Sequence, residues 1–119
     1  MQKISFEIML SAEQISEALI MTNKKVLEVF RDYIAADDSC EVLQSSQGYL
    51  VVDWDSMSDR WVTSRLCKTP QQLRDALRSH YEDYQGYKLT GGYKREPLPS
   101  EETDIRLMGE AMAKRCDES

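Results

Sequence analysis

The stretch "VVDWDSMSDRWV" (residues 51–62) decides how the rest of the chain is interpreted. Segments rich in Val and Trp stand on either side of a short polar segment, which is the pattern of a β-hairpin. If the polar segment forms a four-residue loop, Asp55 faces Arg60 and Trp54 faces Trp61 across the two strands. Opposite-charge and aromatic pairs of this kind each contribute roughly 0.2–1 kcal/mol to sheet stability. We therefore predict a hairpin in which the aspartates have structural roles.

The same aspartates allow a second interpretation, a metal site. Asp53 and Asp55 alternate along one predicted strand, so both project from the same face with their Cα atoms about 7 Å apart. A calcium loop, however, needs acidic or amide groups at its first, third and fifth positions, followed by Gly and a distal Glu. Met57 and Ser58 occupy the places of the fifth ligand and the Gly. The sequence therefore favours the hairpin, and we predict no metal site.

Candidate catalytic residues are few. His80 is the only histidine, and it falls beside the apolar stripe of a predicted tyrosine-rich helix. Neither of the Gly-rich phosphate-binding patterns G-x-x-x-x-G-K-[ST] and G-x-G-x-x-G occurs. We therefore predict a protein that is not an enzyme, with no catalytic residues and no cofactor.

A strand and a helix are predicted before the hairpin. Residues 3–10 alternate between apolar and polar side chains, which indicates a half-buried strand. Ser11 and Gln14 form a capping box that begins a helix. The apolar stripe of this helix extends toward residue 36, either unbroken or with a pause at Thr22–Asn23, where a second helix would be capped.

Two more helices are predicted after the hairpin. Thr69 and Pro70 are typical of a helix start, and Gly86 is predicted to end that helix. A Pro-punctuated segment follows, and Ser100 is predicted to cap a last amphipathic helix that contains Gly109. The order of elements indicates an α+β fold, with an antiparallel sheet of about three strands packed against two main helices and a C-terminal helical tail.

Composition limits the class of protein. The chain has 119 residues and a net charge of −6, and it has no apolar run close to the ~20 residues that span a bilayer. We predict a single α+β domain over residues 1–96, followed by a Pro-flanked linker and helix over 97–119. Its three cysteines include no C-x-x-C pair, so neither a disulfide framework nor a zinc site is expected. Cys116 is expected to be exposed, and the protein is expected to be cytoplasmic without a membrane partner.

One segment resembles a DNA-binding motif. "ISEALIMTNKKVLEVF" (15–30) has the residue spacing of a helix-turn-helix, for which the hairpin would form a wing. The resemblance implies that Asn23, Lys24 and Lys25 meet the major groove. It departs from the motif at Ile20, which holds the turn position usually taken by Gly. One continuous helix explains the same spacing.

Charge points instead to a protein partner. Phosphate contacts need clustered cations, so a chain this acidic is not expected to coat nucleic acid. Arginine and tyrosine are enriched in interface hot spots, which makes Arg78, Tyr87 and Tyr93 interface candidates. The remaining candidates are three carboxylate clusters, Asp37, Asp38 and Glu41; Asp53, Asp55 and Asp59; and Glu101, Glu102 and Asp104.

These features predict a small acidic binding protein. In size and charge layout it is similar to small acidic phage-encoded inhibitors, including anti-CRISPR proteins. That resemblance implies that its acidic faces occupy the nucleic-acid groove of a DNA- or RNA-handling enzyme. The alternatives are a winged helix-turn-helix regulator that binds DNA directly, and a homodimer formed through the C-terminal helix.

Overall fold

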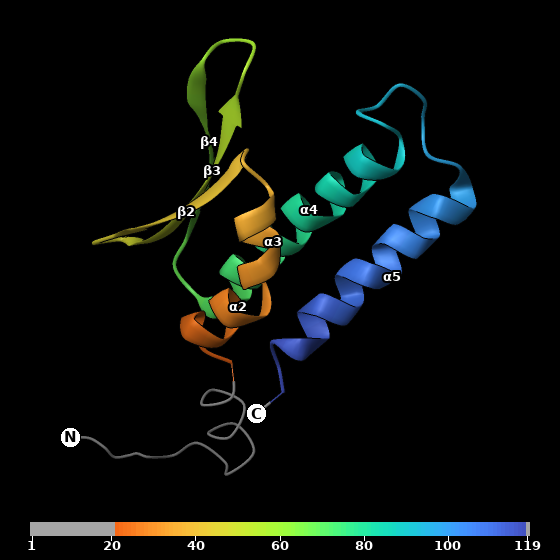
Figure 1. The fold of residues 1–119 in the computed structure, drawn as a ribbon. Helices are drawn as coiled ribbons and strands as arrows, with labels where there is room; N and C mark the ends of the chain where they lie inside the picture. Colours follow the sequence, from red (N-terminus) through yellow and green to blue (C-terminus); the bar gives the residue numbers. More distant parts are fainter. Residues whose placement is uncertain (1–20, 119) are drawn as a thin grey trace, which may run out of the picture.

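The computed structural model describes residues 21–118. The predicted strand over 3–10, the capping box at Ser11 and Gln14, and the start of the first predicted helix lie outside the described residues. Within the described part, two short helices precede three strands and two long helices (Figure 1). The protein is an α+β protein with a small antiparallel sheet and a C-terminal helix, as predicted.

Helix α2 spans Asn23–Val29 and helix α3 spans Arg31–Ala36. Thr22 caps α2, because its hydroxyl accepts a hydrogen bond from the Lys25 amide at 3.1 Å. The sequence left open whether the helix is unbroken or pauses at Thr22–Asn23. The helix that begins at Asn23 agrees with the second alternative. The chain bends at Phe30, where a φ of −93° and a ψ of 6° separate the two helices.

The three strands form one antiparallel sheet in the order β2-β3-β4. Trp54 pairs with Trp61 and Asp55 with Arg60, so the predicted register of the hairpin is confirmed. The two indole rings meet edge to face, with centroids 5.1 Å apart. The strands are β2 (Cys40–Ser45), β3 (Gly48–Asp55) and β4 (Arg60–Cys67).

The hairpin loop accounts for two of the three aspartates in the opening stretch. The Asp55 carboxylate accepts hydrogen bonds from the Met57 amide at 3.0 Å and the Ser58 hydroxyl at 2.8 Å. These two donors, the Ser58 hydroxyl first, hold the pKa of Asp55 below its ordinary value. Asp59 has a φ of 55°, a left-handed conformation that Asp tolerates in turns. Both residues therefore build the turn.

Strand β2 was not predicted. Its sequence "CEVLQS" places Val42 and Leu43 side by side and so lacks the alternation of a half-buried strand. A tight turn holds it against β3 instead. In that turn the Ser45 hydroxyl donates to the Gly48 carbonyl at 2.9 Å. Gly48 has a φ of 137°, and a Cβ at this position would collide with the backbone of Cys67.

Helix α4 spans Pro70–Leu89, and its predicted start is confirmed by the Thr69 hydroxyl, which accepts a hydrogen bond from the Gln72 amide at 3.1 Å. The predicted end at Gly86 is wrong. The helix continues through Gly86, which is buried next to Ile105, and the chain reverses only at Gly91 and Gly92. A glycine that allows close packing is thus not distinguished by sequence from one that ends a helix.

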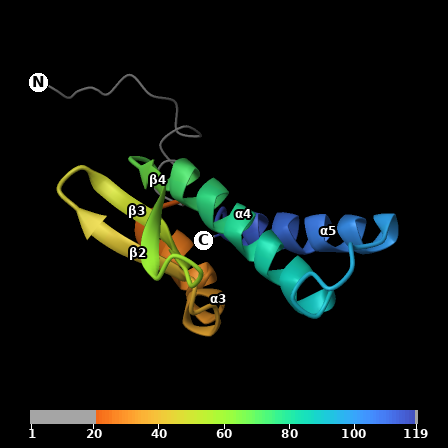
Figure 2. The same ribbon diagram turned by 90° about the horizontal axis from the view of Figure 1, so that it is seen from above.

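Helix α5 spans Pro99–Arg115 and lies along α4 (Figures 1 and 2). The predicted cap at Ser100 is wrong, because Pro99 takes the first helical position and the N-cap is Leu98. The Glu101 carboxylate accepts a hydrogen bond from the Leu98 amide at 2.8 Å. It also receives two hydrogen bonds from Arg95, at 2.8 and 3.0 Å, which fix the start of the helix.

The core lies between one face of the sheet and the helices. Its fully buried side chains include Phe30, Val51, Leu73 and Leu77. Cys116 is also fully buried, so its predicted exposure is wrong; the C-terminal turn of α5 folds against the core. The other sheet face carries Leu43, Leu50 and Leu66 in register across all three strands.

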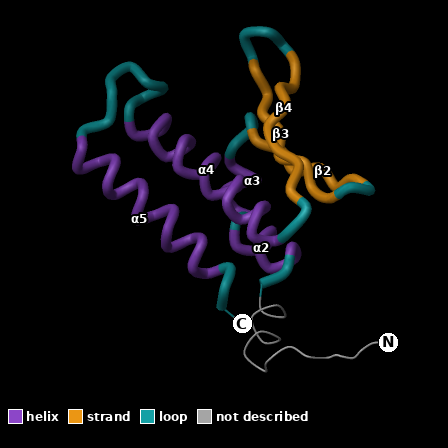
Figure 3. The backbone as a smooth tube through the Cα atoms, turned by 180° about the vertical axis from the view of Figure 1, so that it is seen from behind, coloured by secondary structure: helices purple, strands orange, loops and turns teal. Residues whose placement is uncertain are grey.

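Within residues 21–118, no helix combines the length and the apolar character needed to cross a membrane. Figure 3 shows helix α4 between the sheet and helix α5.

The contact between α4 and α5 depends on Gly109, over which the Glu82 side chain packs. We predict that Gly109→Leu lowers the free energy of unfolding by about 1–3 kcal/mol, because the new side chain must displace Glu82 from Arg78. Ala111→Leu, on the exposed side of α5, should change it by less than about 0.5 kcal/mol. Urea unfolding measures both. Equal stabilities of the two variants would contradict this packing.

Candidate functional site

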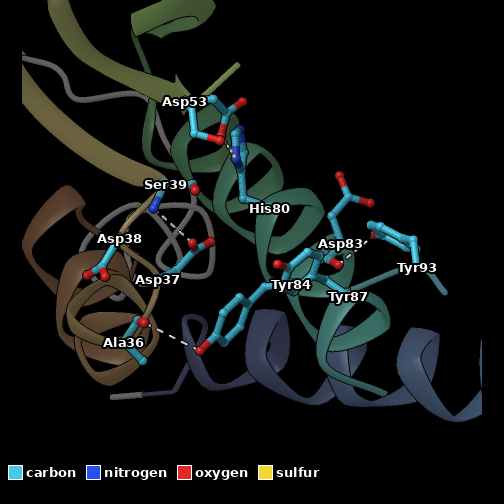
Figure 4. A pocket seen from close by; sticks show the side chains of 11 residues that line it. Ala36, Asp37, Asp38, Ser39, Asp53, His80, Asp83, Tyr84, Tyr87 and Tyr93 are labelled. Carbon is cyan, nitrogen blue, oxygen red and sulfur yellow. Dashed lines mark hydrogen bonds and ion pairs between the residues drawn. The ribbon is translucent and has the colours of Figure 1, made fainter. Parts of the chain in front are cut away.

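A concave site lies where α3 meets β2, beside the end of β3 and the C-terminal half of α4 (Figure 4). Its volume is about 510 Å³. We call it the acidic cleft, because four of its lining residues are aspartates. It is lined by Ala36, Asp37, Asp38, Ser39, Asp53, Ser56, His80, Asp83, Tyr84, Tyr87 and Tyr93.

The connection from α3 to β2 supplies two of these aspartates. Asp37 ends α3 and has a structural role: its carboxylate accepts hydrogen bonds from the Tyr33 hydroxyl at 2.7 Å and the Ser39 amide at 3.0 Å. Burial is the main cause that raises the pKa of the Tyr33 phenol, and the bond to Asp37 adds to it. Asp38 is exposed and makes no hydrogen bond or ion pair with any side chain of residues 21–118. Asp38 is therefore available to a partner.

Asp53 and His80 join the sheet to α4. His80 Nδ1 lies 2.9 Å from Asp53 Oδ1, and the His80 side chain is only 16% exposed. Asp53 faces the helices on β3, whereas Asp55 is the last residue of β3 and its side chain bonds to the hairpin turn, and Asp59 ends that turn. The three aspartates between the tryptophans thus do not form one cluster.

Asp83, one turn after His80, is the carboxylate that the sequence interpretation missed. Burial raises its pKa, and the nearby charges of Asp53 and Glu82 also raise it, while His80 lowers it. No Lys or Arg of the described chain forms an ion pair with Asp83. The carboxylate is therefore partly desolvated, close to like charges and without a Lys or Arg partner among residues 21–118.

Three tyrosines form the wall of the cleft that faces the α3–β2 connection. Tyr87 and Tyr93 meet edge to face with ring centroids 5.6 Å apart, and both side chains are about half exposed. The Tyr93 hydroxyl donates to the Asp83 carbonyl at 2.9 Å, and its backbone φ of 62° is uncommon for an aromatic residue. The Tyr84 hydroxyl donates to the Ala36 carbonyl at 3.3 Å, and Lys88 Nζ lies 5.1 Å from the centre of the Tyr84 ring.

The cleft brings together part of the predicted interface: Asp37, Asp38, Asp53, Tyr87 and Tyr93. The sequence interpretation assigned His80 to the edge of the α4 stripe and left Asp83 and Tyr84 out of the site. The sequence feature that could have identified these three residues is their spacing of three or four residues along α4. This spacing places them on one helix face with Tyr87.

The other predicted interface residues lie outside the cleft. Arg78 is engaged with Glu82 at 2.7 Å, and Glu101 is engaged with Arg95. Arg95 is the main cause that lowers the pKa of Glu101 to about 2. Glu41 points to the sheet face away from the helices, while Asp55 and Asp59 are at the hairpin turn, and Glu102 and Asp104 are exposed on α5.

The residues of the DNA-binding alternative lie together on the first turn of α2. Asn23, Lys24 and Lys25 follow the Thr22 cap directly, and Lys24 is exposed. The first helix and the turn of a helix-turn-helix would fall mostly on residues before 21, outside the described part. Helix α2 itself has only seven residues before the break at Phe30.

The Asp53–His80 pair is the one arrangement in the cleft, among the residues that the structure describes, with a counterpart in enzyme active sites. An Asp–His pair can activate a nucleophile, but no hydroxyl or thiol in residues 21–118 is hydrogen-bonded to His80. The same residues contain no group of three or more His, Cys, Asp or Glu side chains that could hold a metal ion.

Comparison with protein-family models, curated proteins and solved structures gives no match to the chain.

The state of Asp83 leads to a prediction about stability. Because its folded pKa is raised, the wild-type chain loses stability as pH rises from the ordinary Asp pKa of about 3.8 through the folded pKa. Asp83→Asn should therefore be more stable than wild type at pH 7, by less than about 1 kcal/mol because the group is partly solvated. At pH 3 the difference should vanish. Urea unfolding at both pH values, with Asp104→Asn as control, measures this; a less stable Asp83→Asn at pH 7 would contradict it.

Proposed function

We propose that this chain is a small non-enzymatic binding protein, which docks through the acidic cleft on a basic surface of another protein. One observation carries the proposal: four aspartates and three tyrosines converge on a single concave site. Asp38 and Asp83, from opposite walls, have no cation of the described chain as a partner. A cleft lined by charges of one sign concentrates the opposite sign, and tyrosines are frequent interface hot spots.

The partner class that we infer is an enzyme that handles DNA or RNA. Such enzymes bind phosphates through clustered Lys and Arg side chains, which are the groups that an acidic cleft attracts. A protein docked on those cations excludes nucleic acid from the same groove. The similarity in size and charge to small acidic phage-encoded inhibitors, including anti-CRISPR proteins, supports this inhibitory version.

Charged residues away from the cleft are less suited to this role. The guanidinium groups of Arg78 and Arg95 already pair with Glu82 and Glu101. The homodimer through the C-terminal helix stays a prediction: Leu107 and Met108 on α5 are 49% and 41% exposed.

The experiment is a capture from cell lysate with three tagged baits: wild type, Asp38→Lys with Asp83→Lys, and a control with Glu110→Lys and Glu118→Lys. The two variants have the same net charge, and only the first alters the cleft. Wild type and control should retain the same nucleic-acid-handling enzyme, and the cleft variant should not.

A gel-shift assay separates this proposal from direct DNA binding. The isolated chain should not shift labelled duplex DNA. If it does, and Lys24→Glu with Lys25→Glu abolishes the shift, the helix-turn-helix alternative replaces the proposal. Retention of the same enzyme by all three baits would also contradict a role of the cleft.

A further inference from the structure

The walls of the acidic cleft differ in chemistry, which restricts the kind of cation that fits. Asp37, Asp38 and Asp53 lie on the side formed by the sheet and the α3–β2 connection, with Asp38 at the outer edge and its carboxylate directed away from the tyrosine rings (Figure 4). Aromatic rings of Tyr87 and Tyr93, which are 53% and 55% exposed, lie on the other side. A group that fills the cleft therefore meets only carboxylates on one side, and aromatic rings together with the Asp83 carboxylate on the other.

One tyrosine that lines the cleft, Tyr84, already contacts a cation from outside the cleft. The Lys88 ammonium group lies 5.1 Å from the centre of the Tyr84 ring, within the range of a cation–π contact. Tyr84 continues into the cleft toward Ala36, and its neighbour Asp83 has no cationic partner of its own within the described chain. A second cation on the cleft side would serve both groups.

Geometry favours a flat cation over a compact one. A guanidinium group is planar, so it stacks on an aromatic ring while its edge donates several hydrogen bonds to carboxylates. An ammonium group is a compact and strongly hydrated charge that cannot do both in one plane. We therefore propose that the acidic cleft is a recognition site for an arginine side chain of the partner protein. This inference rests on the proposed function and names the group that the cleft takes.

The test uses small probes rather than the partner. N-acetyl-arginine methylamide, its lysine counterpart and its neutral citrulline counterpart are each titrated into ¹⁵N-labelled full-length protein at low salt, followed by amide chemical shifts. The arginine probe should bind at least about tenfold more tightly than the citrulline probe, the difference expected for hydrogen bonds to a charged group. It should also bind more tightly than the lysine probe, and the shifts should be concentrated at cleft residues.

Two variants locate the binding. Asp83→Asn and Tyr87→Leu should each weaken the arginine probe by about tenfold, since one removes a charge and the other removes an aromatic face. Glu110→Gln should leave binding unchanged. Unchanged amide spectra outside the cleft show that the variants remain folded, and circular dichroism of Asp83→Asn provides a second check.

Equal binding of the lysine and arginine probes would overturn the inference, as would shifts spread over the whole surface. The outcome is distinguishable from that of the proposed function. If the arginine probe fails while enzyme capture still depends on Asp38 and Asp83, the docking proposal stands and arginine recognition falls. If the probe binds in the cleft while capture is independent of it, the opposite holds.

Discussion

Charge reversal by Asp38→Lys with Asp83→Lys should weaken binding to the captured enzyme by about 100-fold or more. Removing one partner of a buried interfacial charge pair typically costs about 2–5 kcal/mol, and reversal adds repulsion to that loss. Neither carboxylate supports the fold through hydrogen bonds or ion pairs with other side chains of the described residues, so the variant should remain folded. Biolayer interferometry with the purified enzyme gives the dissociation constant.

The control separates cleft contacts from overall charge. Glu110→Lys with Glu118→Lys changes the net charge by the same amount but lies outside the cleft, and it should weaken binding by less than about tenfold, mainly through slower association. Wild-type binding should also weaken as salt increases, because the contacts are electrostatic. Equal losses for both double variants would mean that long-range charge, and not the cleft, determines affinity.

Phe30→Ala should lower the free energy of unfolding by about 3–5 kcal/mol, the range for removing a large buried aromatic side chain. Phe30 is fully buried at the junction of α2 and α3, and its ring meets Tyr81 of α4 edge to face at 6.2 Å. Its loss leaves a cavity between the short helices and α4. Because small domains have only about 5–15 kcal/mol of stability, a loss of this size is visible as a large shift of the urea midpoint.

Met57→Ala is the matched control for this effect, because the Met57 side chain is 94% exposed at the hairpin tip. It should change the free energy of unfolding by less than about 0.5 kcal/mol. If Phe30→Ala costs no more than Met57→Ala, the placement of the bend between α2 and α3 against α4 is wrong. Circular dichroism at increasing urea concentrations measures both variants under the same conditions.

Local chemistry explains which elements the sequence predicted well. The hairpin register follows from two side-chain pairs, Trp54 with Trp61 and Asp55 with Arg60, and both are present. The start of α4 follows from the Thr69 cap, whose hydrogen bond closes within three residues. These features depend on neighbours along the chain or across one turn, so a single sequence contains the information they need.

Elements that depend on distant packing were missed. The sequence of β2 has no alternating pattern. The segment is a strand because it pairs with β3 in the antiparallel sheet. Gly86 is read as a helix end from sequence alone, but helix α5 packs beside it and the helix continues. Cys116 is near the chain end, yet the packing of α5 buries it completely.

The cleft was predicted only in part, for the same reason. Asp37, Asp38 and Asp53 were candidates as members of separate carboxylate clusters, and only the fold places them in one site. Asp83 was missed because it lies in a tyrosine-rich segment in which Lys and Arg residues outnumber Asp and Glu residues. That no Lys or Arg of the described residues pairs with it becomes evident only when the positions of the surrounding side chains are known.

Competition between this chain and nucleic acid tests the docking proposal most directly. Fluorescence anisotropy of a labelled nucleic acid bound to the captured enzyme is followed while the chain is added. Wild type should displace the nucleic acid completely, and Asp38→Lys with Asp83→Lys should need at least about 100-fold more protein to do so. Displacement by the double variant at the same concentration as wild type, or an enzyme–nucleic acid complex that persists at saturating wild type, would contradict the account.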